Sequence, residues 1–149
     1  MTVEQIEKGA AAVHPATLYV LAQRLYEGGK RDEAVFWYYV GQLRFRFYLS
    51  ANPQLNESED AKLFGKLAEV VGIPIDEYAF QDIPKLLKTL ERVKEWDEKN
   101  PNGFTSKETN HAVWLEVREG FRGFISEVEQ IGAASKSSAP SDKGAGKER

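Results

Sequence analysis

Apolar residues recur at intervals of three and four along much of the chain, the spacing that places side chains on one face of a helix. Pro15 suits the first turn of such a helix, because its fixed φ fits and its missing N–H donor is not needed there. Gly28 and Gly29 end the pattern. The segment 15–27 is therefore predicted to be an amphipathic helix, with these residues on its apolar face: Leu18, Leu21, Ala22, Leu25 and Tyr26.

The next segment begins near Asp32, ends at about Ser50, and is apolar or aromatic on all sides. A helix of this kind is buried on most sides, so we predict that it is the central helix, with Trp37 and its neighbouring tyrosines mostly in the core. The aromatic and β-branched content would also suit a strand. However, the run AVFWYYVGQLRFRFYL has sixteen residues without a turn signal, which is longer than a typical strand.

Turn and capping residues divide the middle of the chain. A helix is predicted after Ser58, ending at Gly72, and Pro74 then predicts a turn followed by a connector. Asp82 is a good N-cap for another helix, which runs to about Lys99. Both segments repeat apolar residues at helical spacing and are expected to pack against the central helix.

Two stretches have the pattern of a capping box, in which an N-cap side chain and the residue three positions later bond to each other's backbone. Thr2–Gln5 predicts a short helix that Gly9 ends. Thr105–Glu108 predicts the start of a long last helix that reaches about residue 131, with Gly132 at its end.

The composition changes after this helix to Ser, Ala, Gly, Lys and Pro, with no aliphatic side chain larger than that of alanine. Such a segment cannot offset the entropy that ordering would cost. The sequence therefore predicts an all-α fold: one compact bundle of about five principal helices over residues 1–132, and a disordered tail over residues 133–149.

Charge and composition narrow the classes of partner. The net charge is −3, and four cations against two carboxylates from Gly132 onward leave −5 for the body. An acidic body disfavours nonspecific binding to nucleic acid. The chain has no cysteine, no basic segment followed by an apolar run at its N-terminus, and no stretch near the roughly 20 apolar residues of a membrane span. These features predict a cytoplasmic protein without a nucleic-acid or membrane partner.

The stretch LAQRLYEGGKRDEAVFWYY, within residues 15–50, resembles one unit of the tetratricopeptide-like solenoid repeats. Leu21 and Leu25 match packing positions of the first helix of such a unit, and the small Ala34 and Trp37 match those of the second. The resemblance implies a single helical hairpin of this type inside the bundle, because no second copy follows and about three repeats usually form a solenoid. The DEAVFWYYVGQLRFR segment also resembles small bacterial proteins of the toxin-immunity kind, which implies that the protein binds another protein.

The sequence contains few candidates for catalytic or metal-ligating residues. The only histidines are His14 and His111, and Glu108 with His111 makes one carboxylate–imidazole pair where a di-iron bundle needs two. His14 is interpreted as a helix-entry residue. Arg44 and Arg46 lie among aromatic residues, a pattern that can mark stacking on nucleic-acid bases, but in an acidic body a cation paired with carboxylates inside the bundle is the favoured interpretation. We therefore predict no enzyme, no catalytic residues, no metal site and no cofactor.

The favoured hypothesis is an immunity protein that occludes the basic active-site cleft of a toxin with an acidic surface; complementary charge would speed association. The alternative is a scaffold or adaptor that holds a peptide in a helical groove. Six carboxylates are predicted to contact the partner: Glu57, Glu59, Asp60, Asp76, Glu77 and Asp82. For four of them (Glu57, Glu59, Asp60 and Asp82) the alternative is stabilisation of helix ends by offsetting the helix dipole. This alternative explains Asp76 and Glu77 less well, because Pro74 interrupts the chain just before them.

Overall fold

The computed structural model describes residues 1–137 of the chain, with side chains described up to Ser135. Within that range the regular secondary structure is helical, and no strand occurs. The all-α bundle predicted from the sequence is confirmed. In chain order the helices are α1 (Val3–Lys8), α2 (Pro15–Glu27), α3 (Arg31–Ala51), α4 (Glu59–Leu67), α5 (Ile73–Ala79), α6 (Ile83–Lys99) and α7 (His111–Ser137), with a 3-10 turn at Pro53–Leu55 and a π-helical turn at Ala68–Gly72.

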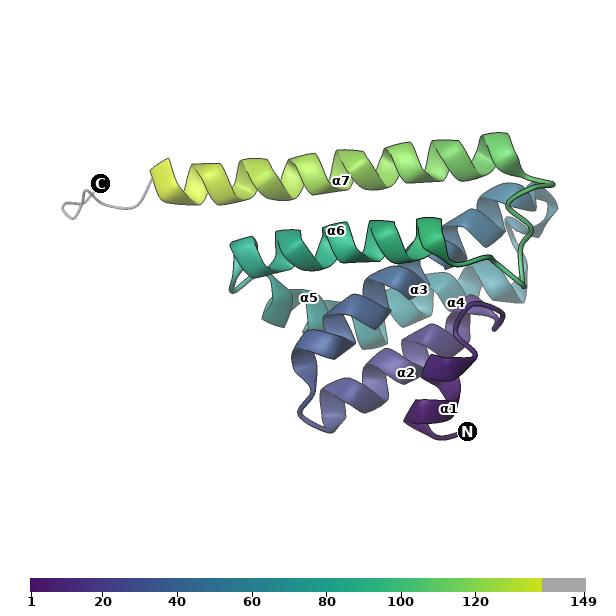
Figure 1. The fold of residues 1–149 in the computed structure, drawn as a ribbon, viewed down its shortest axis with the longest axis horizontal. Coiled ribbons are helices and arrows are strands. Elements are labelled where there is room, and N and C mark those ends of the chain that lie inside the picture. Colours follow the sequence, from purple (N-terminus) through teal and green to yellow (C-terminus); the bar gives the residue numbers. More distant parts are fainter. Residues whose placement is uncertain (138–149) are drawn as a thin grey trace.

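Helix α3 lies in the middle of the bundle, as its apolar circumference predicted. It packs against α2, α5, α6 and α7, and α6 and α7 lie side by side above it in Figure 1. Tyr38, Tyr39, Phe45 and Phe47 of α3 are almost wholly buried. Trp37, by contrast, is only half-buried, because it lies on the side of α3 that faces α6 near the surface.

Helices α2 and α3 form an antiparallel hairpin whose turn includes Gly29, at a φ of 87° that favours glycine. A Cβ at Gly41 would lie 3.1 Å from Leu18 Cβ and from a ring carbon of Tyr19. The absence of a side chain at Gly41 therefore lets the two helices approach closely. The hairpin is observed; its membership of the tetratricopeptide-like repeats stays a prediction.

Several helix ends match the sequence analysis. Thr2 and Gln5 form the capping box of α1, and Gly9 follows its last residue. His14 is the N-cap of α2, where its Nδ1 atom accepts the N–H of Ala16 at 3.0 Å. Asp82 caps α6 by accepting the N–H of Lys85 at 3.1 Å. Ser58 caps α4 by accepting the N–H of Ala61 at 3.2 Å, so short-range signals located four helix starts correctly.

The predicted connector after Gly72 is wrong. The chain stays helical through the π-helical turn and into α5, with Pro74 in the first turn of α5. Proline is tolerated there because a first-turn N–H has no partner within the helix. The turn is compact at Gly72, where a Cβ would lie 2.5 Å from the Tyr38 hydroxyl.

The start and end predicted for the last helix are also wrong. Residues 104–110 form turns instead of a capping box: Asn102 Oδ1 accepts the N–H groups of Phe104 and Thr105, and Ser106 Oγ accepts that of Thr109. Helix α7 then begins at His111 and continues past Gly132 to Ser137. The remainder of the predicted tail, residues 138–149, lies outside the described residues.

A buried ionic cluster fixes the carboxyl end of α6 against α3. Arg44 Nε donates to Asp97 Oδ1 at 2.9 Å, and Trp114 Nε1 and Arg118 Nη1 donate to Asp97 Oδ2 at 3.0 and 3.2 Å. Lys107 donates to the backbone oxygen of Asp97 and, at 2.6 Å, to that of Asn100. The prediction of a cation paired with a carboxylate inside the bundle is confirmed for Arg44, whereas Arg46 is exposed.

Candidate functional site

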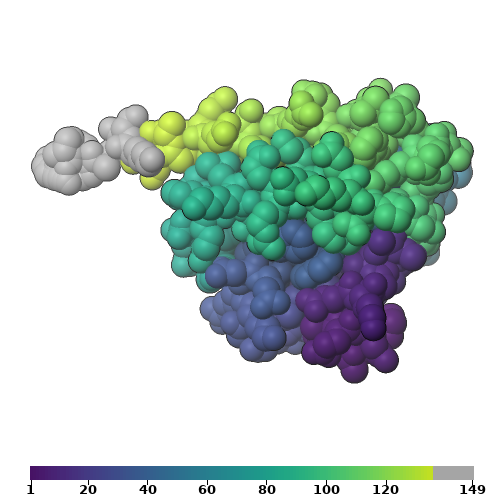
Figure 2. All heavy atoms as spheres, in the orientation of Figure 1, coloured from purple at the N-terminus to yellow at the C-terminus, as the bar shows by residue number. Residues whose placement is uncertain are grey.

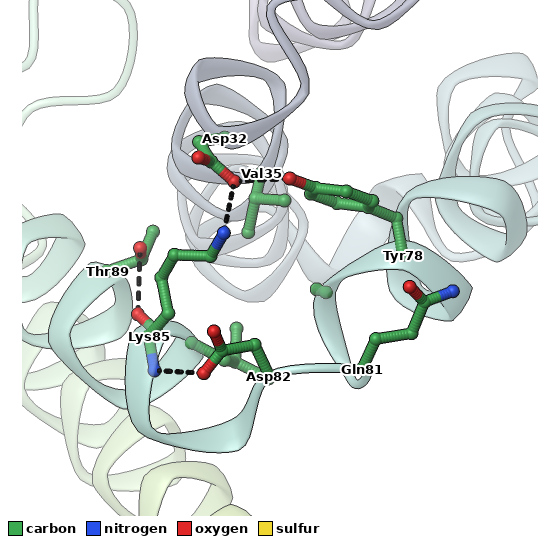
Figure 3. A pocket seen from close by; sticks show the side chains of 9 residues that line it. Asp32, Val35, Tyr78, Gln81, Asp82, Lys85 and Thr89 are labelled. Carbon is green, nitrogen blue, oxygen red and sulfur yellow. Dashed lines mark hydrogen bonds and ion pairs between the residues drawn. The ribbon is translucent and has the colours of Figure 1, made fainter.

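A hollow of about 200 Å³ lies where the amino ends of α3 and α6 meet the carboxyl end of α5. Figure 3 shows that polar side chains from all three helices surround it. Its lining residues are Asp32, Val35, Tyr78, Ala79, Gln81, Asp82, Lys85, Leu86 and Thr89.

Asp32 is the centre of the polar contacts in this hollow. Its Oδ1 atom accepts the Tyr78 hydroxyl at 2.6 Å and lies 3.0 Å from Lys85 Nζ (Figure 3). These two contacts, the bond from Tyr78 first, hold the pKa of Asp32 below its usual value. The same bond raises the pKa of Tyr78. Asp32 is therefore ionised at neutral pH and neutralises much of the charge of Lys85.

The first turns of α6 position the cationic wall of the hollow. Asp82 caps the helix, and Thr89 Oγ1 donates to the backbone oxygen of Lys85 at 3.1 Å. Leu86, Leu90 and Val93 are buried toward the core, whereas Lys85, Lys88 and Arg92 of the same helix are exposed. The wall therefore belongs to a regular helix that is anchored in the core.

The hollow continues along α6 into a second depression of about 490 Å³, with which it shares Asp32, Lys85 and Thr89. We call the two together the α3–α6 groove. In Figure 2 the boundary between α3 (blue) and α6 (teal to green) reaches the surface on the face shown. The second part is lined in addition by Glu33, Phe36, Trp37, Lys88 and Arg92.

The floor of this second part is aromatic. The Trp37 ring meets the Phe36 and Trp96 rings edge-on, with centroids 5.0 and 5.5 Å apart. The guanidinium of Arg92 lies over the Phe36 ring, 4.7 Å from its centroid. Lys88 is exposed and makes no ion pair or hydrogen bond with the described residues. The groove thus offers a partly exposed indole and two cations without a carboxylate partner.

The structure does not gather the six predicted partner-binding carboxylates at one place. Asp82 alone lines the α3–α6 groove. Asp60 bridges three elements, since its Oδ2 atom accepts the Tyr48 hydroxyl at 2.6 Å and lies 3.2 Å from His14 Nε2. The bond to Asp60 raises the pKa of Tyr48 to about 12. Asp76 accepts the hydroxyl of Tyr39, and burial raises the pKa of Asp76.

The remaining three predicted residues are exposed. Glu59 is 3.6 Å from Lys62 in an exposed ion pair, whereas Glu57 and Glu77 make no contact of this kind with the described residues. Three of the six carboxylates therefore bond within the fold, as the alternative of helix-end stabilisation anticipated for Asp82. Their role in partner binding stays a prediction.

Sequence reasoning missed most residues of the groove. The central helix was predicted to begin near Asp32, but it begins at Arg31 with Lys30 as N-cap, and the Asp32 side chain contacts Tyr78 and Lys85. A usable signal was present on α6: Lys85, Lys88 and Arg92 are spaced by three and four residues, which places them on one helix face. Tyr78 gave no signal, because α5 had been interpreted as a connector.

No family model matches the chain, and no solved structure matches it. A 101-residue stretch is 32% identical to an uncharacterized protein of Haemophilus influenzae, covering 66% of this chain and 38% of that protein. The chain thus spans well under half the length of this relative.

The described residues offer neither a metal site nor a membrane-spanning helix. They contain no cluster of three or more side chains of the kinds that ligate metals. None of the described helices combines the length and the apolar character that crossing a membrane requires. What the α3–α6 groove offers chemically is recognition of a ligand by charge and aromatic contact.

Proposed function

We propose that this protein binds another protein and holds a segment of it in the α3–α6 groove. Support comes from the composition of the groove, which combines an aromatic floor with charged walls. Tryptophan, tyrosine and arginine are the residues most enriched at energetic hot spots of interfaces. Trp37, Tyr78 and Arg92 all line this groove.

The proposal rests mainly on two groups in the groove, the Trp37 indole N–H and the Lys88 ammonium group, that have no partner among the described residues. Trp37 is half-buried, and no described group accepts its indole N–H; Lys88 lies beside it without a carboxylate. Both walls belong to helices, and the Arg44–Asp97 bond holds the two helices together at their far end. A ligand would therefore complete these contacts without requiring the walls to move, which limits the entropic cost of binding.

A peptide library displayed on phage tests the proposal. Peptides selected on the protein should shift the NMR amide signals of Phe36, Lys88 and Arg92 and the indole signal of Trp37. The indole signal of Trp114, which donates to Asp97, serves as an internal control and should stay in place. Selection of no peptide, or of peptides that perturb only other faces, would contradict the proposal.

The toxin-immunity hypothesis names a more specific partner, and the exposed Glu57, Glu59 and Glu77 are the part of the predicted acidic surface left for it. We propose testing it with charge reversal at Glu57 and Glu77, because Asp76 bonds to Tyr39 and its reversal would also perturb the fold. Contact with a basic cleft predicts slower association at low salt, with the deficit shrinking as salt is added. Unchanged association would move the contact elsewhere.

A further inference from the structure

The α6 wall of the α3–α6 groove is cationic in an acidic protein. Three cations line it (Lys85, Lys88 and Arg92), against Asp32 and Glu33 on the facing helix and Asp82 at one end. The whole chain, however, carries a net charge of −3. Lys85 is paired with Asp32, and Asp82 bonds to the backbone of α6. On the α6 wall, Lys88 and Arg92 are therefore left without a carboxylate partner, and Glu33 on the facing helix is left without a cation.

Lys88 and Arg92 stand one helical turn apart on α6, which corresponds to a rise of about 6 Å along the axis. In an extended peptide, side chains two residues apart point the same way and are separated by about 6.6–6.8 Å. A segment lying along α6 can thus present carboxylates at alternate positions to Lys88 and Arg92 together. The residues between them would point to the other wall of the groove.

That other wall presents Phe36 and Trp37 at the level of Arg92. It suits apolar side chains, and closer to Lys85 it presents Asp32 and Glu33. Two carboxylates on this wall would repel the continuous row of phosphates in a nucleic acid, which needs many cations for binding. The charges favour a short acidic peptide segment over a polyanion.

We propose that the α3–α6 groove takes an extended acidic segment of a partner protein. Its carboxylates at alternate positions face Lys88 and Arg92, and the apolar residues between them face Trp37. This inference rests on the proposed function and names the chemistry of its partner.

Fluorescence anisotropy with three labelled heptapeptides tests the inference. The first alternates glutamate with leucine, the second replaces each glutamate by glutamine, and the third replaces each by lysine. We expect the glutamate peptide to bind about tenfold more tightly than the glutamine peptide at low salt, as two exposed ion pairs allow. The lysine peptide should bind most weakly.

The double variant Lys88→Gln with Arg92→Gln should abolish the preference for the glutamate peptide. Lys66→Gln with Arg122→Gln is the matched control, since it removes the same charge from exposed residues on α4 and α7 and should retain the preference. A single-stranded oligonucleotide serves as the polyanion probe and should bind more weakly than the glutamate peptide.

Three outcomes would overturn the inference: equal affinity for the glutamate and glutamine peptides, no binding of the glutamate peptide, or equal loss of the preference in both double variants. Tighter binding of the oligonucleotide would overturn it as well. The phage-display selection described above distinguishes rejection of an acidic partner from rejection of peptide binding in the groove. Selected peptides that occupy the groove but lack acidic residues would reject the acidic partner and retain the groove.

Discussion

Two ion pairs join α3 to α6, and they differ in little except their surroundings. Arg44 and Asp97 are 2.9 Å apart with both side chains 3% exposed. Asp32 and Lys85 are 3.0 Å apart with side chains 61% and 48% exposed. The partners of each pair are 53 residues apart in sequence, so the two helices run parallel, with one pair at each end.

The comparison shows that the N···O distance of an ion pair says little about its contribution to the stability of the fold. Asp97 accepts bonds from Arg44, Trp114 and Arg118 and is almost wholly buried. Breaking such a pair leaves a charge buried and uncompensated. Asp32 and Lys85 are hydrated whether paired or not, and exposed pairs contribute little. The first pair fixes the fold; the second can exchange partners.

The largest effect is expected from Asp97→Ala. Removal of one partner of the buried cluster should cost roughly 3–5 kcal/mol of unfolding free energy, because Arg44 and Arg118 would remain buried without their carboxylate. Urea denaturation followed by circular dichroism measures this loss. A loss no greater than that of Glu98→Ala, which removes the exposed carboxylate beside Arg118, would show that burial does not distinguish these two carboxylates.

A smaller loss is expected from Trp37→Ala. The residue is half-buried, so its removal should cost less than the roughly 3–5 kcal/mol of a fully buried tryptophan. It should also abolish binding of the glutamate–leucine peptide, which loses its apolar contact. Phe47→Ala, on the buried side of the same helix, is the comparison: it should lower stability more than Trp37→Ala. The reverse order would place Trp37 in the core.

The contrast between the two ends also explains what the sequence predicted well. Arg44 lies in a helix that is apolar all round, so its interior pairing followed from the pattern of its neighbours. The same pattern located α3 as the central helix, and short-range signals located the starts of α1, α2, α4 and α6. These properties depend on residues a few positions apart, which a single sequence displays.

The groove depends on tertiary contacts, which a single sequence does not display. Asp32 and Tyr78 are far apart along the chain, and nothing in either segment indicates that they bond. The sequence from Thr105 to Glu108 matches the pattern of a capping box. However, Lys107 donates to backbone oxygens at the carboxyl end of α6, and α7 begins only at His111. Pro74 was given too much weight as a helix breaker, since first-turn positions tolerate it.

Asp76 is intermediate in burial between the buried Asp97 and the exposed Asp32. Its carboxylate accepts a hydrogen bond from the Tyr39 hydroxyl on α3 and has no cation as a partner among the described residues. Burial raises its pKa, so its contribution to stability is fully present below the unfolded pKa and is lost as pH rises through the folded pKa. Asp76→Asn should therefore stabilise the protein at neutral pH relative to acidic pH, measured as the difference in melting temperature between variant and parent. A difference that does not change between pH 3 and pH 7 would contradict the burial effect.

The smallest effect on stability is expected from Asp32→Asn, which removes the charge at the exposed end while keeping an acceptor for Tyr78. Its unfolding midpoint should stay near that of the parent, because Lys85 remains hydrated.

The same change should strengthen binding of the glutamate–leucine peptide, since Lys85 loses its partner and joins Lys88 and Arg92 in the α3–α6 groove. The gain should diminish as salt screens the added charge. Lys85→Gln in the Asp32→Asn background separates the causes: if the freed lysine is responsible, this second substitution returns the affinity to that of the parent. A gain that persists without Lys85 would mean that Asp32 had repelled the peptide directly, and the exchangeable pair would then have no part in binding.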